Sequence, residues 1–186
     1  MKIGITGSIA SGKTTVAKVI ANKKNPLFSA DDNVKSLYKD KHFKSRIIKK
    51  FSLAKSKNIK NQLKRLIVKD KQNLKELEKF IHPYVRKKMF EFIKKNIKKK
   101  LIVFEIPLLI ESKLMKYFDK IVFVGAKRET RLKRYIKKGG NKSFFSLLEN
   151  RQLSPSKKSK YCDYKIVNNK NINILNKKIK YIINNI

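Results

Sequence analysis

Short apolar segments alternate with longer amphipathic ones from the first residue onward. Residues 3–5 have the pattern of a short strand, and apolar positions at helical spacing predict a helix over 13–21. A second short strand is predicted over 26–30, followed by a helix over 34–38. The chain therefore opens with a strand, a loop, a helix and a second strand.

The middle of the chain is predicted to be helical. Over residues 43–99 the apolar positions keep a 3.6-residue period, with a break or kink expected at Pro83. Two continuous apolar runs follow, at 101–104 and 121–124, and such runs are typical of buried parallel strands. Between them and the C-terminus lies a basic segment, 127–160, with a helical pattern.

A last strand at residues 164–167 and a C-terminal amphipathic helix complete five strands alternating with helices. This order predicts an α/β fold with a central parallel sheet. Ligands of such sheets bind beyond the carboxyl ends of the strands. Gly7, Asp31, Glu105 and Gly125 all fall at those ends.

The loop after the first strand has the spacing of a phosphate-binding loop. Residues 7–15 are GSIASGKTT, and Gly7, Gly12, Lys13 and Thr14 match the pattern G-x-x-x-x-G-K-[ST]. In such a loop backbone N–H groups surround the phosphates, the lysine reaches the β- and γ-phosphates, and the hydroxyl binds Mg²⁺. The predicted ATP-binding residues of the loop are Gly7, Ala10, Ser11, Gly12, Lys13, Thr14 and Thr15.

Composition adds one competing hypothesis. The 186 residues suit one domain, but 49 Lys and Arg against 13 Asp and Glu give a formal net charge of +36, which is typical of a nucleic-acid-binding protein. The lysines are spread over every region, which favours a compositional bias over a dedicated binding surface. The single cysteine, Cys162, excludes an intramolecular disulfide and, with no signal peptide or membrane-length apolar run, favours a cytoplasmic protein.

Residues 4–14, GITGSIASGKT, resemble the opening motif of the dephospho-coenzyme A kinases, a family of P-loop kinases. The resemblance runs from Met1 to about Asn169 and implies the fold of P-loop nucleoside-triphosphate hydrolases. Ser8 and Ala10 stand where this family has glycines. Neither position is one that the general P-loop pattern requires, so we expect the loop to keep its function.

Three further segments resemble the acceptor side of this family. Ser29-Ala30-Asp31 matches its D-A-D motif with the first aspartate replaced, and Asp31 is implied to orient the acceptor hydroxyl. The alternative is that Asp31 only caps the following helix. Residues 77–85, LEKFIHPYV, match the family's L-E-x-I-x-H-P-x-V, which implies that His82 and Arg86 bind substrate. Lys60 stands where the family has an arginine and is the third substrate-side candidate in the helical segment.

Residues 105–111, EIPLLIE, resemble the family's D-x-P-L-L-[FY]-E. Glu105 replaces an aspartate, and the resemblance implies that it assists Thr14 at a Mg²⁺ ion. Pro107 and Leu108 are implied to offer apolar surface to the substrate, although simple packing would also explain them.

The basic segment resembles the family's lid. Arg134 matches the arginine of E-x-Q-x-x-R, with Arg131 in place of the glutamine, and is implied to stabilise the transferring phosphoryl group. An exposed arginine on a helix face is the alternative. Gln152 and the segment 162–168 match further family positions, with Asn168 expected near the adenine.

The sequence thus predicts a single kinase domain over 1–186, with a helical acceptor-side insertion at about 43–99 and a lid at about 128–160. The implied reaction is the ATP-dependent phosphorylation of the 3′-hydroxyl of dephospho-CoA, with Asp31, Lys13 and Arg134 as catalytic residues and Mg²⁺ as cofactor. We expect a monomer or weak homo-oligomer that binds neither membranes nor specific nucleic acid. The alternatives are a P-loop kinase of another nucleoside or nucleotide, and a basic nucleic-acid-binding protein.

Overall fold

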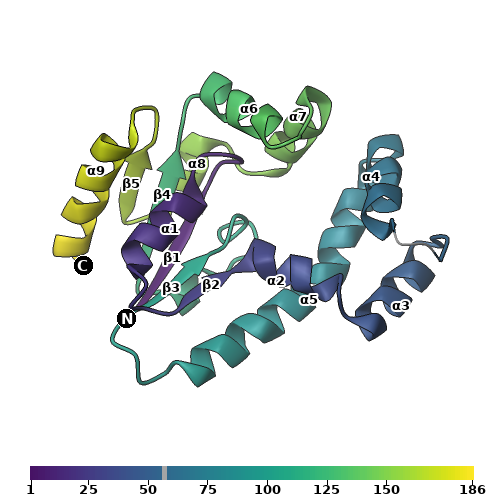
Figure 1. Cartoon of the computed structure of the whole chain (residues 1–186), viewed down its shortest axis with the longest axis horizontal. Helices are drawn as coiled ribbons and strands as arrows, with labels where there is room; N and C mark the ends of the chain where they lie inside the picture. Colours follow the sequence, from purple (N-terminus) through teal and green to yellow (C-terminus); the bar gives the residue numbers. More distant parts are fainter. Residues whose placement is uncertain (56–57) are drawn as a thin grey trace. The chain divides into compact units, whose positions relative to one another are not determined.

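Five parallel strands form one sheet in the order β2-β3-β1-β4-β5 (Figure 1). The structure, a computed structural model, describes residues 1–55 and 58–186. The strands are β1 (Lys2–Gly7), β2 (Leu27–Ser29), β3 (Ile102–Glu105), β4 (Lys120–Gly125) and β5 (Tyr164–Val167). The predicted parallel α/β sheet is confirmed, with strand ends that differ from the sequence prediction by at most two residues.

The register of the strands brings their carboxyl ends together. In β1, Ile5 lies opposite Glu105 of β3, and Gly7 lies opposite Val124 of β4. Gly125 at the end of β4 in turn lies opposite Val167 of β5. The polar strand ends therefore share one edge of the sheet, which is where ligands bind in folds of this kind.

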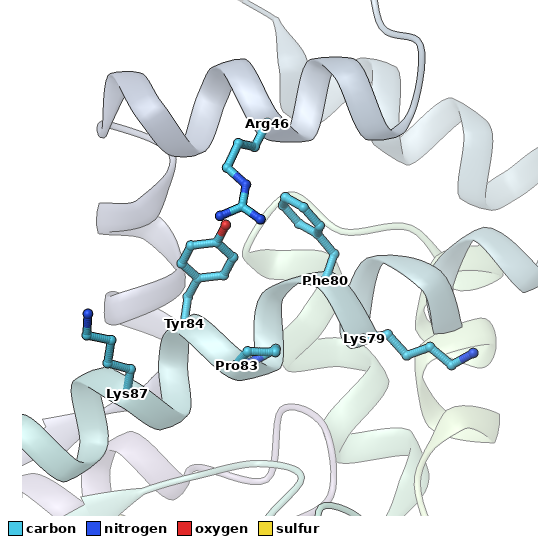
Figure 2. A pocket seen from close by; sticks show the side chains of 6 residues that line it. All are labelled: Arg46, Lys79, Phe80, Pro83, Tyr84 and Lys87. Carbon is cyan, nitrogen blue, oxygen red and sulfur yellow. The ribbon is translucent and has the colours of Figure 1, made fainter.

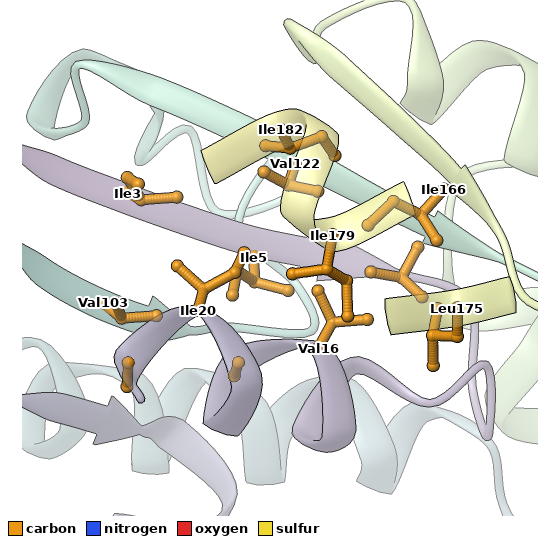
Figure 3. Close-up of a cluster of buried hydrophobic side chains, with 13 residues drawn as sticks. Ile3, Ile5, Val16, Ile20, Val103, Val122, Ile166, Leu175, Ile179 and Ile182 are labelled. Atoms are coloured by element: carbon orange, nitrogen blue, oxygen red, sulfur yellow. The ribbon is translucent and has the colours of Figure 1, made fainter. Parts of the chain in front are cut away.

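One face of the sheet is covered by α1 (Lys13–Ala21) and α9 (Ile172–Asn184). Their apolar side chains pack on those of the strands in a cluster that Figure 3 shows, with Ile179 of α9 between the two helices and the sheet. The helix predicted over 13–21 is confirmed to the residue. The side chain of Asn171 accepts a hydrogen bond from the Ile174 N–H and so caps the start of α9.

The other face of the sheet is aromatic. The Phe104 ring contacts Phe28 with a centroid distance of 5.8 Å and Phe118 with a distance of 5.2 Å. Gly4 of β1 leaves the space that this layer needs, because a Cβ there would come within 2.6 Å of the Leu109 side chain. Apolar residues on alternate sides of each strand thus build two packed layers around the sheet.

The chain divides into two compact units, one formed by residues 1–29 and 95–186 and the other by 30–94. The second unit is helical, as predicted, and consists of α2 (Ala30–Leu37), α3 (Lys41–Lys50), α4 (Ile59–Lys69) and α5 (Gln72–Lys95). Its own core centres on Phe43, whose ring contacts Tyr38, Phe80 and Tyr84 at centroid distances of 5.2–5.6 Å.

Two predictions in this unit are wrong in detail. The helix expected from residue 34 begins at Ala30, so that Asp31 lies within its first turn, where carboxylates interact favourably with the helix dipole. A break or kink was predicted at Pro83, and the break is absent, since α5 continues through this residue. Pro83 is exposed, while Ile81 and Met89 of the same helix are buried, and this packing maintains the helix on both sides of the missing N–H.

The basic segment of the first unit folds into α6 (Arg128–Lys137), α7 (Lys142–Arg151) and α8 (Pro155–Ser159). A short 3₁₀ helix, η1 (Met115–Tyr117), precedes β4. No helix within the described ranges has the length and apolar character needed to cross a bilayer.

The buried position of Ile179 generates a stability prediction. Ile179→Ala should lower the free energy of unfolding by about 3 kcal/mol, because it opens a cavity where α9 packs on the sheet. Ile183→Ala, on the exposed side of the same helix, should change it by less than about 0.5 kcal/mol. Urea unfolding followed by circular dichroism measures both, and equal losses would contradict the packing described.

Candidate active site

The loop between β1 and α1 adopts a conformation that its glycines permit. Gly7 and Gly12 have φ values of 146° and 98°, and Ala10 has a φ of 55°. A Cβ at Gly7 would overlap the Val124 carbonyl oxygen, so a larger residue has no room between β1 and β4. Ala10, where the family has glycine, is accommodated in the left-handed region.

The loop is held by three side chains that lie far away in the sequence. Asn168 donates a hydrogen bond from Nδ2 to the Ser11 carbonyl oxygen at 2.8 Å, and Arg134 donates from Nη1 to the same oxygen at 3.4 Å. Gln152 accepts a hydrogen bond from the Ile9 N–H at 3.1 Å. The loop conformation therefore depends on α6, on the end of α7 and on the segment after β5.

Lys13 and Thr14 begin α1 and face different partners. Lys13 is buried and donates from Nζ to the Ser8 carbonyl oxygen at 2.9 Å. The exposed Thr14 donates from Oγ1 to Oε1 of Glu105 at 2.6 Å. The N-cap residue, Gly12, makes no side-chain cap hydrogen bond, and a helix start without a side-chain cap is a favourable place for an anion.

Thr14 and Glu105 form a set of oxygen donors that suits Mg²⁺. Mg²⁺ usually takes one or two protein oxygens and keeps water and phosphate oxygens for its other positions. Glu105 is 2% exposed at the end of β3, which puts a carboxylate in contact with the loop hydroxyl. No cluster of three or more His, Cys, Asp or Glu side chains that could hold a metal exists among the described residues. The donors present fit a cation shared with phosphate.

Arg131 is buried and connects α6 to α7. It is 3% exposed, donates from Nε to the Ala126 carbonyl oxygen at 3.0 Å, and donates from Nη2 to Oε1 of Glu149 at 2.6 Å. Arg128 contacts the other carboxylate oxygen at 2.8 Å. Burial acts to raise the pKa of Glu149, but the hydrogen bonds and charges of Arg131 and Arg128 outweigh it and lower the pKa.

The two arginines of α6 have different surroundings. Arg131 replaces a glutamine of the family pattern and is bound to Glu149 of α7, whereas Arg134 is half-buried and contacts the phosphate-binding loop. Sequence reasoning missed the roles of Gln152 and Arg131 in this arrangement. The family position of Gln152 was a signal, but its partner, Ile9, could not be named without the fold.

Asn168 was predicted to lie near the adenine, and the structure gives its side chain a contact with the loop. Its backbone N–H donates to the Gly125 carbonyl oxygen at 2.8 Å, and its amide approaches Gly12 so closely that a Cβ at that glycine would overlap it. The adenine contact stays a prediction.

The substrate-side candidates in the helical unit have different surroundings. Asp31 is exposed in the first turn of α2. His82 is half-buried and Arg86 is exposed, both on α5. The Lys60 ammonium lies 5.0 Å from the centroid of the Tyr38 ring, and burial raises the pKa of Tyr38 to about 12.

A cavity of about 410 Å³ lies in the same unit (Figure 2). Its wall is apolar, formed by Phe80, Pro83 and Tyr84 of α5, and three cationic side chains surround it. The guanidinium carbon of Arg46, on α3, lies 5.6 Å from the centroid of the Tyr84 ring. The sequence prediction named none of these as site residues, although their spacing places the α5 members on one helix face. The complete lining is Arg46, Lys79, Phe80, Pro83, Tyr84 and Lys87.

The parallel sheet and the loop at its edge define a P-loop phosphotransferase. Comparison with known proteins gives the family. The dephospho-CoA kinase family matches residues 1–173. The chain is 36% identical to the dephospho-CoA kinase of Fusobacterium nucleatum, over 97% of this chain and 95% of the relative. It is 34% identical to that of Rickettsia typhi, over 100% and 97%. The chain belongs to the dephospho-CoA kinase family.

Solved structures agree with this assignment. The dephospho-CoA kinase from Campylobacter jejuni superimposes with a TM-score of 0.68 at 26% identity, over 99% of this chain and 96% of that chain. The shikimate kinase from Acinetobacter baumannii, at 14% identity and a TM-score of 0.55 over 99% and 93%, shares the fold alone. The fold is thus common to kinases with different names, and the family match is more specific.

The lowered pKa of Glu149 leads to a prediction about pH. Because the folded-state pKa lies below the ordinary value of 4.5, the stabilisation by the Arg131–Glu149 contact is fully present above about pH 4.5 and is lost as the pH falls through the folded-state value. Glu149→Gln should therefore lower the free energy of unfolding by about 2 kcal/mol at pH 7. The difference from wild type should shrink below pH 4.5 in urea titrations, and a difference that grows with acidity would contradict this account.

Proposed function

We propose that this protein transfers the γ-phosphoryl group of ATP to the 3′-hydroxyl of dephospho-CoA and releases coenzyme A and ADP. The observation that carries the ATP half is the convergence of Asn168, Arg134 and Gln152 on a loop that ends in Lys13 and Thr14. The acceptor half rests on membership of the dephospho-CoA kinase family over residues 1–173.

On the ATP side, the loop binds the phosphates with its backbone N–H groups and the start of α1. Lys13 would exchange its bond to the Ser8 carbonyl oxygen for the β- and γ-phosphates, since a charged oxygen is the stronger acceptor. Arg134 is bound to the loop at Ser11 and is our proposed donor to the transferring group. In the proposed lid, about 128–160, closure would exclude water from the phosphates.

Thr14 and Glu105 are the residues that would hold Mg²⁺, which when bound neutralises charge on the β- and γ-phosphate oxygens. Glu105 has a longer side chain than the family's aspartate, and its contact with Thr14 shows that it still reaches the loop hydroxyl.

On the acceptor side, we propose that Asp31 orients the 3′-hydroxyl and accepts its proton. Its exposure in the first turn of α2 leaves the carboxylate open to a ligand. His82 and Arg86 of α5, with Lys60, are proposed to bind the acceptor within the helical insertion, about 43–99. Lys60 already contacts the Tyr38 ring, so in its proposed role the ammonium would contact both this ring and the acceptor.

Pro107 and Leu108 are proposed to line the acceptor site from the segment after β3. Both are half-buried, whereas the next two residues, Leu109 and Ile110, are buried. The exposed parts of Pro107 and Leu108 can supply apolar surface to a ligand, while the buried Leu109 and Ile110 hold the segment in place.

The remaining expectations stay predictions. Mg²⁺ dependence, a cytoplasmic location and a monomeric or weakly oligomeric state belong to the proposal. The net charge of +36 is proposed to attract anionic substrates in general and not a specific nucleic acid.

The direct test is the mass of the product. Incubated with ATP and Mg²⁺, the wild-type protein should add one phosphoryl group to dephospho-CoA, as measured by mass spectrometry, across a panel that includes nucleosides and nucleotides. Lys13→Ala should reduce the transfer at least about 100-fold, because it removes the cation at the phosphates. Turnover of a nucleoside with none of dephospho-CoA would refute the proposed acceptor. Salt-resistant RNA or DNA binding without ATP consumption would favour the nucleic-acid alternative.

The proposed role of Arg134 predicts a loss of kcat. Arg134→Ala should lower kcat by about 100- to 1000-fold and raise the ATP KM less, because the guanidinium acts mainly on charge that develops in the transition state. Lys133→Ala removes a neighbouring exposed charge from the same helix and should change kcat by less than about twofold. A similar loss of kcat in both variants would mean that the positive charge of α6 in general, and not a specific contact of Arg134, supports the reaction.

A further inference from the structure

Lys158 on α8 is a fully buried charged side chain that the mechanism above does not use. Its exposed fraction is 0%, and its ammonium donates to the Pro107 carbonyl oxygen at 2.5 Å and to Oε1 of Glu111 at 2.9 Å. Glu111 also accepts from the Leu153 N–H at 3.0 Å. Burial lowers the pKa of Lys158, and the Glu111 charge opposes this effect.

The Pro107 carbonyl oxygen is the point where this cluster meets the phosphate-binding strand. It accepts a second hydrogen bond, at 3.0 Å, from Oγ1 of Thr6, which immediately precedes Gly7. Thr6 is itself fully buried. One backbone oxygen thus connects the end of β1, the segment after β3 and α8.

Stability alone is a weak reason for such a cluster. A buried ion pair rarely stabilises a fold more than apolar side chains of the same size would, because both charges lose their hydration. One oxygen of the Glu111 carboxylate, Oε2, is buried without a hydrogen-bond partner among the described residues, which adds to that cost. The burial cost of the Lys158–Glu111 pair suggests that the pair is kept to hold the Pro107 segment in one defined position.

The geometry that it defines is that of the segment proposed to meet the acceptor. Leu109 is fully buried, and the Ile106 N–H donates to the Ile5 carbonyl oxygen at 2.9 Å, so the segment is fixed on both sides of Pro107 and Leu108. Those two residues have partly exposed side chains, and the Pro107 carbonyl is held by Lys158 from the buried side.

We propose that Lys158, with Glu111, is a positioning residue that sets the place of Pro107 and Leu108 for dephospho-CoA. This inference rests on the proposed function, in which those two residues line the acceptor site. It predicts a selective effect on the acceptor, since the side chains that hold the phosphate-binding loop are Asn168, Arg134 and Gln152, and Lys158 is not among them.

The test uses a variant that removes the charge pair without leaving one charge buried alone. In Lys158→Met/Glu111→Gln the glutamine oxygen can still accept from the Leu153 N–H. The hydrogen bond from Lys158 to the Pro107 carbonyl oxygen is lost. We expect the KM for dephospho-CoA to rise about tenfold or more and the KM for ATP to change less than about twofold. Lys157→Met removes an exposed charge from the same short helix and serves as the matched control, with both KM values unchanged.

Thermal melting of each variant separates positioning from folding. If the double variant keeps its melting temperature and shows the selective rise in KM, the positioning role is supported. Wild-type KM values, or equal rises for both substrates, would overturn it. Thr6→Val gives an independent measurement if the double variant does not fold, because it removes the other donor to Pro107 with little change of shape, and it should raise the acceptor KM in the same selective way.

Wild-type activity is measured first and keeps the two proposals apart. No turnover of dephospho-CoA by the wild-type protein would refute the proposed function itself. Normal wild-type turnover with unchanged KM values in both Lys158→Met/Glu111→Gln and Thr6→Val would refute only the positioning role.

Discussion

The pairing of β1 between β3 and β4 is the constraint on which the rest of the site depends. Parallel pairing in this register brings the end of β1 beside Glu105 on one side and Val124 on the other. Gly7 fits there only because it has no Cβ, and the chain must then turn away from the sheet into the loop. The direction of α1, and hence the positions of Lys13 and Thr14, follow from that turn.

Buried charges in the first unit each have a structural partner, in contrast to the many exposed lysines. Lys13 is bound to the Ser8 carbonyl oxygen, Arg131 to Glu149, and Lys158 to Glu111 and Pro107. Burying an unpaired charge would be far more costly than leaving it in water, so each partner was a condition for placing the charge there. The net charge of +36 therefore comes mainly from exposed side chains, whereas these few buried cations have defined neighbours.

Most of the fold could be predicted from the residue pattern. The five strands, the bounds of α1 and the helices α3, α4 and α5 follow from apolar periodicity, which is strong where a face is fully buried. Residues 56–57 of the predicted helical segment lie outside the described residues. The errors have local causes. The start of α2 was missed because Asp31 suggested a cap, whereas it lies in the first turn of the helix. Pro83 suggested a break or kink because proline removes a helical hydrogen bond. The packing of Ile81 and Met89, which keeps the helix continuous, could not be seen in the sequence.

The order of residues was sufficient to identify the phosphate-binding loop, because its glycines, lysine and threonine are adjacent in the chain and their chemistry is local. Family motifs extended this to the acceptor. Only the folded chain could show that Ser11 is held by Asn168, 157 residues away, and Pro107 by Lys158, 51 residues away. Such contacts leave no periodic or local signal, since they arise where parallel strands end at a common edge and bring distant segments within hydrogen-bonding distance.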